Sequence, residues 1–133
     1  MSIDVTAEVH IDADAQRIWD YMTDPQKEPE WIKGIKSSRL QGEPPLHEGS
    51  RVERVASFLG RRIHYLNEVT QHDPPRTLDM RSVVAPFPMR ITYTIDGNTV
   101  RNRVQGGGSR LMSPLVRRNI QRDLERLKAI VER

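Results

Sequence analysis

Asp123 is the ionisable side chain whose place in the sequence best suits acid–base chemistry. It lies among apolar residues of the C-terminal segment that repeat with the period of one helix face. Burial on such a face raises the pKa of a carboxyl, while the charge of Arg126 lowers it. A raised pKa would let Asp123 act as a general acid or base; the other interpretation is that it is tied to a neighbouring backbone group or arginine. Further acid–base candidates are Tyr65, Tyr93 and His64.

Other patterns that carry chemistry are missing from the sequence. There is no cysteine, which excludes disulfides, thiolate nucleophiles and cysteine metal sites. The four histidines form no HxxxH or HExxH motif, and there is no Gly-x-Ser-x-Gly nucleophile elbow. The glycines at 106–108 lack the Lys-Ser/Thr ending of a phosphate loop and are interpreted as a hinge between a strand and a helix. We therefore assign no catalytic residue, no metal ligand and no cofactor.

The elements that would position these side chains begin with a strand. Apolar and polar residues alternate over 3–11, which is typical of a half-buried strand. The segment that follows predicts a short helix whose apolar side holds Ile18, Trp19 and Met22. Asp24-Pro25 ends this helix, because the residue before a proline avoids helical geometry. Residues 29–32 predict one more helical turn.

The residue pattern of the middle of the chain, from 36 to 105, predicts strands. Turn residues recur between apolar stretches, and Asp96-Gly97 is typical of a tight hairpin because both residues tolerate positive φ. The predicted strands lie near 36–41, 50–58, 61–70, 77–83, 89–95 and 99–105. Because successive strands joined by short turns pair with each other, these segments predict an antiparallel meander.

The chain ends in an amphipathic helix that begins at Ser109 or Ser113. Pro114 suits the first turn, where a missing N–H matters little. One apolar arc of this helix contains Met112, Val116, Ile120, Leu124, Leu127, Ile130 and Val131. The order of strand, helix, strands and helix predicts an α+β fold, with this last helix laid across a curved sheet.

Composition and charge exclude several classes of function. The length predicts a single domain over 1–133. The 21 basic and 18 acidic residues are interleaved, which favours a solvated surface over a nucleic-acid groove. No apolar run approaches the roughly 20 residues of a membrane span, and the N-terminus lacks a signal-peptide core. We expect a cytoplasmic monomer or homodimer that binds no nucleic acid and does not insert stably into a membrane.

Short motifs along almost the whole chain carry a family resemblance. They are Ile11-x-Ala13 leading to Ile18-Trp19, Asp24-Pro25 leading to Trp31, Gly49-Ser50-Arg51, Glu68-Val69-Thr70 with Asp73-Pro74-Pro75-Arg76-x-Leu78, the hairpin into Val100, and Asp123-Leu124-x-x-Leu127-Lys128. With these motifs the chain resembles the polyketide cyclase/dehydrase and lipid-transport family. That family has the helix-grip fold of the birch-pollen-allergen and START (SRPBCC) superfamily.

The resemblance implies both a fold and a function. The fold would be a curved antiparallel sheet of about seven strands wrapped around a long C-terminal helix, with two short helices after the first strand. It would enclose a cavity between sheet and helix. Family members bind lipids, isoprenoid quinones, aromatic polyketides or hormones there, and a minority catalyse cyclisation or dehydration.

Strand alternation predicts which side chains face that cavity. The inward faces are mostly apolar but include polar groups, and a buried polar group costs about 1–3 kcal/mol if unpaired. These groups should therefore pair with each other, with water, or with polar atoms of a ligand. The candidate ligand-binding residues are Trp31, Tyr65, Asn67, Met80, Met89, Tyr93, Asn102, Met112, Asn119 and Asp123.

Three hypotheses of function follow. The first is binding of a small hydrophobic or amphipathic ligand, such as a lipid, isoprenoid quinone or polyketide-like aromatic. The alternative is a cyclase or dehydratase that uses acid–base residues of the same cavity. The third is an interaction module, in which Arg118, Arg122 and Arg126 on one side of the helix contact an acidic membrane or protein surface.

Overall fold

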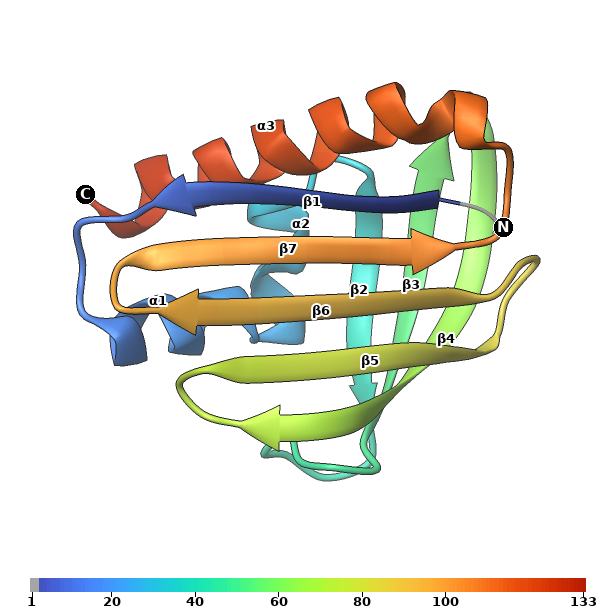
Figure 1. Cartoon of the computed structure of the whole chain (residues 1–133). Helices are drawn as coiled ribbons and strands as arrows, with labels where there is room; N and C mark the ends of the chain where they lie inside the picture. Colours follow the sequence, from blue (N-terminus) through green and yellow to red (C-terminus); the bar gives the residue numbers. More distant parts are fainter. Residues whose placement is uncertain (1–2) are drawn as a thin grey trace.

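The computed structural model describes residues 3–133, and Figure 1 shows their arrangement. In chain order the elements are β1 (Ile3–His10), α1 (Ala15–Met22), η1 (Pro25–Lys27), α2 (Glu28–Trp31), β2 (Ile35–Gln41), β3 (Arg51–Phe58), β4 (Arg61–Asp73), β5 (Thr77–Val84), β6 (Met89–Asp96), β7 (Thr99–Gly106), η2 (Arg110–Met112) and α3 (Ser113–Val131). The predicted α+β order is confirmed.

Within the described residues, seven strands form one antiparallel sheet in the order β1-β7-β6-β5-β4-β3-β2. Neighbours in sequence pair from β2 to β7, and β1 returns to pair with β7 along its length. In that last pair Val5 lies opposite Val104, and Val9 lies opposite Val100. The predicted meander and hairpin at Asp96-Gly97 are therefore confirmed.

Extra residues in β2, β4 and β5 shift the pairing register and accompany the curvature of the sheet. The pairing of β4 with β5 shifts register between Leu66 and Asn67 and again between Val69 and Gln71. An extra residue in one strand bends that strand and increases its twist. In Figure 1, β2, β3 and β4 cross steeply behind β5, β6, β7 and β1. The pairing also continues beyond the predicted end of β4, because His72 still lies opposite Leu78.

α3 is held against the edge strand β1. Gln121 donates from Nε2 to the carbonyl of Glu8 at 3.1 Å, and Lys128 donates from Nζ to the carbonyl of His10 at 2.8 Å. Both predicted starting points have a role, because Ser109 Oγ accepts from the Leu111 N–H and caps η2 while α3 begins at Ser113. The helix therefore lies along β1 at the top of Figure 1, with its apolar arc toward the concave face of the sheet.

The hydrophobic core lies between the concave face of the sheet, the short helices and the second half of α3. It contains fully buried side chains from each of these layers, among them Ile11, Ile18, Met22, Trp31, Leu78, Val100, Leu124 and Leu127. The short helices thus close one end of the concave face.

Candidate functional site

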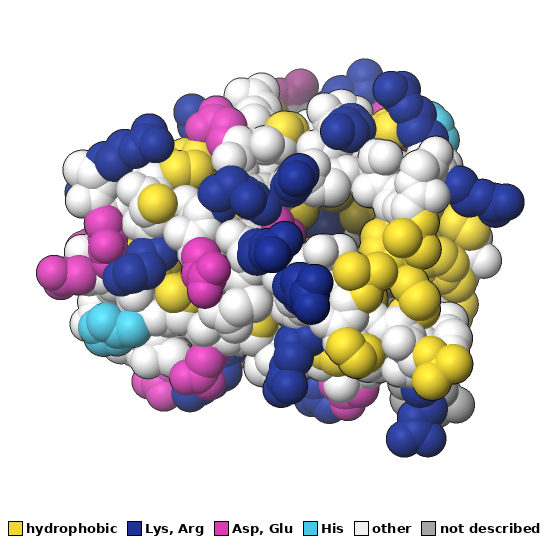
Figure 2. Space-filling model, turned by 90° about the horizontal axis from the view of Figure 1, so that it is seen from above, with side chains coloured by type: hydrophobic (Ala, Val, Ile, Leu, Met, Phe, Trp, Pro, Cys, Tyr) yellow, Lys and Arg dark blue, Asp and Glu magenta, His cyan; other side chains and the backbone are white. Residues whose placement is uncertain are grey.

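The other end of the concave face is open. Side chains on the inward faces of β3, β4 and β6, in η2 and on the apolar arc of α3 remain partly exposed there. They are Phe58, Ile63, Met89, Met112 and Val116. Figure 2, which looks down on the molecule from the side of α3, shows a hollow bordered by hydrophobic side chains on its right and by Lys and Arg side chains on its left. The interior is therefore packed beneath α1 and α2, whereas inward-facing side chains at the opposite end remain partly exposed.

A buried ion pair lies on the concave face. Arg54 is 2% exposed and extends from β3 toward Glu28, the first residue of α2. It donates from Nε to Glu28 Oε1 at 2.9 Å and from Nη2 to Oε2 at 2.5 Å. Burial lowers the pKa of Arg54, but the charge and hydrogen bonds of Glu28 outweigh burial and raise it well above its usual range. Arg54 therefore keeps its positive charge in the interior, next to the Glu28 carboxylate.

Tyr93 connects this ion pair to the neighbouring strand and to α2. Its hydroxyl lies 3.5 Å from Arg54 Nη2, its ring packs against Trp31 with centroids 5.9 Å apart, and it lies opposite Asn102 of β7. Burial raises the pKa of Tyr93 to about 12, although the Arg54 charge opposes this shift. The phenol is therefore protonated near neutral pH, and it can donate a hydrogen bond while accepting one from Arg54.

Asn67 lies beside the same ion pair on β4. In the pairing of β3 with β4, Arg54 lies opposite Tyr65 and Val52 lies opposite Asn67, so Arg54 and Asn67 are diagonal neighbours on the concave face. We call the group formed by Glu28, Trp31, Arg54, Tyr65, Asn67, Tyr93 and Asn102 the interior polar cluster; all seven side chains are buried.

Several polar atoms of this cluster are unpaired. Within residues 3–133, Trp31 Nε1, both side-chain amide atoms of Asn67 and Asn102 Oδ1 are buried without a hydrogen-bond partner, as is Ser38 Oγ on β2. Such atoms are rare in folded proteins, and each costs about 1–3 kcal/mol. A few unpaired donors and acceptors among apolar side chains are what a binding site uses to orient an amphipathic ligand.

Most of the residues predicted for the cavity are buried or half-buried. Trp31, Tyr65, Asn67, Met80, Tyr93 and Asn102 are buried on the inside, and Met89 and Met112 are half-buried near the open end. Asn119, one turn before Asp123 on α3, departs from the prediction, because it is exposed rather than turned toward the inside. The predicted contact of these residues with a ligand stays a prediction.

Asp123 lies at the contact between α3 and α2. Arg126 donates from Nη2 to Asp123 Oδ1 at 2.6 Å and from Nε to the carbonyl of Trp31 at 3.1 Å, and the Lys33 N–H lies 3.3 Å from the same Asp123 oxygen. Burial raises the pKa of Asp123, while Lys33 and Arg126 oppose the shift. Asp123 is thus tied to an arginine and a backbone group, and it supports Trp31 indirectly.

The acid–base candidates are not brought together. Tyr65 and Tyr93 belong to the interior polar cluster, whereas His64 is exposed on the other face of β4 and Asp123 is held at the junction of α2 and α3. Within residues 3–133, no group of three His, Cys, Asp or Glu side chains could hold a metal ion. No helix in this part of the chain is long and apolar enough to cross a membrane.

Sequence reasoning missed Glu28 and Arg54. Charged residues normally face solvent, so composition alone gives no reason to place Arg54 in the interior. The available signal was its position in the alternation Val52-x-Arg54-x-Ala56, which assigns Arg54 to the inward face of its strand. Nothing in the local sequence marks Glu28 as its partner, because the two residues are joined only by the tertiary fold.

Two open depressions on the outer surface are poorer candidates for an apolar ligand. One, of about 620 Å³, lies between α1 and the end of α3; the other, of about 860 Å³, lies between β1 and the start of α3. Most of the residues that line each depression are polar or charged. The interior polar cluster belongs to neither.

A curved seven-stranded antiparallel sheet with a long C-terminal helix and short helices after β1 defines the helix-grip class of proteins. The chain belongs to the polyketide cyclase / dehydrase and lipid transport family, whose model matches residues 2–132. A search of curated proteins finds no sequence match.

Solved structures with little sequence identity share this fold. The ginseng major latex-like protein 151 from Panax ginseng is 14% identical with a TM-score of 0.78, over 98% of this chain and 97% of that one. The Zhui aromatase/cyclase from Streptomyces sp. R1128 is 16% identical with a TM-score of 0.76, over 100% and 95% of the two chains. A protein from Thermus thermophilus is 19% identical with a TM-score of 0.76, over 96% of each chain. At these identities the likeness shows the fold alone.

Proposed function

We propose that this protein binds a small amphipathic molecule on the concave face, between the sheet and α3. The observation that carries the proposal is the set of unpaired polar atoms on Trp31, Asn67 and Asn102. A ligand whose polar group reached these atoms would satisfy them, while its apolar body occupied the remaining space. Lipids, isoprenoid quinones and polyketide-like aromatics have this combination of parts.

The charge of the site favours a neutral polar group on the ligand. Glu28 neutralises Arg54 within the interior, so a buried anion would meet the Glu28 carboxylate and a buried cation would meet the Arg54 guanidinium. The Trp31 N–H and the Asn67 amide can donate, and the Asn67 and Asn102 oxygens can accept. A ketone, quinone or hydroxyl group fits this set of partners.

The apolar part of the ligand would extend toward the open end. Met89 and Met112 are half-buried there, and methionine side chains adapt to irregular shapes because they are unbranched and flexible. Met80 lies deeper on the same face of the sheet, opposite Ile91 on β6. We place this binding in the cytoplasm, by a monomer or homodimer, as the sequence predicts.

A cyclase or dehydratase is the second candidate function, and the buried position of Arg54 favours it. A guanidinium beside Tyr93 could stabilise the oxyanion of an enolised ligand. Binding ranks first because the only carboxylate of the interior polar cluster, Glu28, is already held by Arg54, and Asp123 is held by Arg126. Conversion of a bound polyketide-like substrate by the wild type, lost in Tyr93→Phe with affinity retained, would favour the enzyme.

Ligand screening tests the binding proposal directly. Native mass spectrometry would be recorded after incubation with a fatty acid, an isoprenoid quinone and a polycyclic aromatic ketone. We expect a one-to-one complex with at least one of them, much weakened in Asn67→Leu. His64→Gln, on the exposed face of the same strand, should bind like the wild type. The proposal is wrong if none of these classes binds, or if both variants bind equally well.

A further inference from the structure

We propose that the open end of the molecule docks on the surface of an anionic lipid bilayer. This inference rests on the proposed function only for the route by which a ligand would enter. Its evidence is a group of large exposed hydrophobic side chains, which we call the apolar rim: Leu59, Val83, Val84, Phe87 and Leu111. Soluble proteins seldom expose such side chains in a group unless the surface has a partner.

The apolar rim comes from three segments that meet at one end of the fold. They are the turn between β3 and β4, the end of β5 with the turn into β6, and η2, and all three lie at the right-hand end of Figure 1. The β5–β6 turn contacts the segment leading to η2, because the Gly107 N–H donates to the carbonyl of Pro88 at 2.9 Å. Figure 2 shows hydrophobic side chains gathered at this end beside the hollow.

Leu59 is held in a backbone conformation that leucine disfavours. Leu59 and Gly60 form the two-residue turn between β3 and β4, with φ values of 52° and 78°. Two positive φ values are the pattern of a type I′ turn, in which Asn-Gly is strongly preferred. The Leu59 side chain is nevertheless 70% exposed, so the fold gains little from it. A leucine that costs stability and stays in solvent points to a contact outside the molecule.

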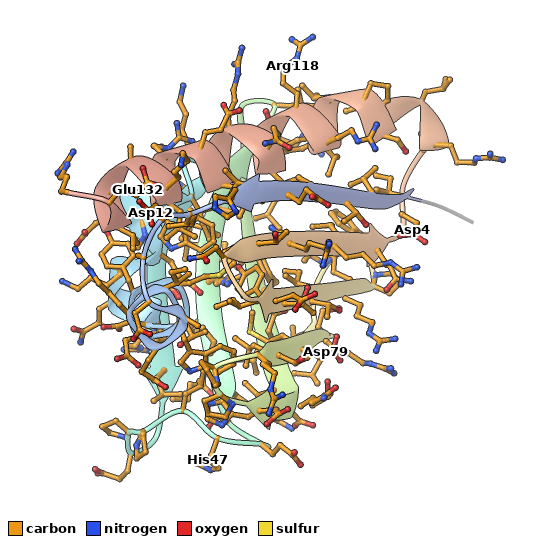
Figure 3. The ribbon with its side chains drawn as sticks, turned by 60° about the vertical axis from the view of Figure 1, so that its left-hand side comes forward. Asp4, Asp12, His47, Asp79, Arg118 and Glu132 are labelled. Atoms are coloured by element: carbon orange, nitrogen blue, oxygen red, sulfur yellow. The ribbon has the colours of Figure 1, made fainter. Side chains whose placement is uncertain are left out.

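The three segments of the apolar rim carry basic but no acidic side chains, and Asp4, which lines the same depression as Arg117 and Arg118, is paired with Arg103. There is no aspartate or glutamate in residues 54–67, 80–95 or 97–122, which include all three segments. The exposed arginines of these ranges that form no ion pair within residues 3–133 are Arg61, Arg62, Arg110, Arg117, Arg118 and Arg122. Figure 3 shows Arg118 pointing away from the molecule.

Arginines elsewhere on the sheet are paired with carboxylates. Arg39 contacts Glu53 at 2.7 Å, and Arg103 contacts Asp4 at 2.8 Å. Unpaired arginines around exposed aliphatic residues match the two parts of an anionic membrane surface, its charged headgroups and its apolar interior. A second copy of the chain fits less well, because the same arginines would face each other. Nucleic acid fits less well because four of the five rim residues are aliphatic and cannot stack on bases.

Vesicle flotation with ligand-free protein tests the proposal. Vesicles of phosphatidylcholine with phosphatidylglycerol should bind the protein, salt should weaken this binding, and phosphatidylcholine alone should not bind it. Arg61→Gln should weaken binding roughly fivefold, since each arginine near such a surface contributes about that factor. Arg76→Gln, an equal loss of charge in the β4–β5 turn, should have no effect.

The variant Leu59→Asn distinguishes an effect on membrane docking from an effect on folding stability. It should weaken binding to the anionic vesicles and at the same time raise the melting temperature, because asparagine suits the positive φ. Leu111→Ser, at a position 89% exposed, should weaken binding without changing stability. Both variants should still bind a soluble ligand of the interior, so failure of docking is distinguishable from failure of the proposed function.

Four results with vesicles or in gel filtration would overturn the proposal. They are equal binding to both kinds of vesicle, no binding to either, unchanged binding by Leu59→Asn and Leu111→Ser, and elution as a dimer that Leu111→Ser disperses. The last result would assign the apolar rim to a second copy of the chain. Tight binding to a single-stranded oligonucleotide in place of the vesicles would likewise reject a lipid surface as the partner.

Discussion

Arg54 on β3 donates to both carboxylate oxygens of Glu28, at 2.9 and 2.5 Å, although both side chains are buried. This ion pair joins the sheet to α2, the helix that ends with Trp31. Because Trp31 packs on Tyr93, which in turn lies next to Arg54, the pair fixes the geometry of the interior polar cluster.

Arg54→Leu should destabilise the protein by about 3–5 kcal/mol, because the Glu28 carboxylate would stay buried without a partner. The double variant Glu28→Leu/Arg54→Leu should recover most of this loss, since it leaves no buried charge. Urea unfolding monitored by circular dichroism measures both free energies. A double variant as unstable as Arg54→Leu would show that the ion pair itself, rather than the uncompensated charge, stabilises the fold.

Asn67→Leu should stabilise the ligand-free protein by about 1–3 kcal/mol, because it removes two buried polar atoms that have no partner. Asn98→Leu is the matched control. Asn98 donates from Nδ2 to the carbonyls of Ile11 and Ala13, both at 2.9 Å, so its replacement should destabilise. Thermal unfolding compares the two variants. If Asn67→Leu also destabilised, the Asn67 amide would have a structural role, and the argument for a ligand anchor would be lost.

Asp79 should make the fold sensitive to acid. Burial raises the pKa of this carboxyl, but hydrogen bonds from Thr70, Thr92 and Arg90 outweigh burial and hold it below the ordinary value of 3.8. The folded state thus binds this proton more weakly than the unfolded state does. The contribution of Asp79 to stability is present above pH 3.8 and is lost as the pH falls through its folded pKa.

The matching variant is Asp79→Asn, which should be less stable than the wild type at neutral pH. The difference in unfolding free energy should shrink as the pH falls below 3.8. Denaturant unfolding at a series of pH values measures it. If this difference between wild type and variant stayed constant down to strong acid, Asp79 would have the same pKa in the folded and unfolded states.

Ligand affinity should not change across the neutral and mildly alkaline range. Tyr93, with its pKa raised to about 12, keeps its proton there, and Arg54, with its pKa raised well above its usual range, keeps its charge. Isothermal titration calorimetry with a neutral quinone at several pH values measures this. If the affinity instead changed with a midpoint pH close to neutrality, another titrating group would contact the ligand. Tyr93→Phe would then leave that midpoint unchanged.

Much of the fold and part of the site could be predicted from the sequence. Strand alternation located Asn67, Tyr93 and Asn102 on the inside, because side chains on a strand alternate faces regardless of tertiary context. The position of Asp123 on the apolar arc was also correct, and so was its tie to Arg126. Helical spacing places Arg126 within reach of Asp123 on the same helix.

The remainder depends on tertiary contacts. Arg54 and Glu28 are 26 residues apart, and each has the polarity of a surface residue. Their pairing is decided by how the bent sheet meets α2, which no local pattern contains. The exposed rim could not be predicted for the same reason, because Leu59 and Leu111 resemble ordinary core residues until the structure leaves them in solvent.

The central claim, that the interior polar cluster anchors a ligand, is tested most directly by the fluorescence of Trp31. In the variant Trp19→Phe, Trp31 is the only tryptophan, and its indole N–H is one of the unpaired donors. Titration with an isoprenoid quinone should quench this emission with a saturable, one-to-one dependence. Adding Asn67→Leu should weaken the apparent affinity about tenfold or more, the loss expected for about 1.4 kcal/mol. Quenching that does not saturate, or an affinity that Asn67→Leu leaves unchanged, would contradict the claim.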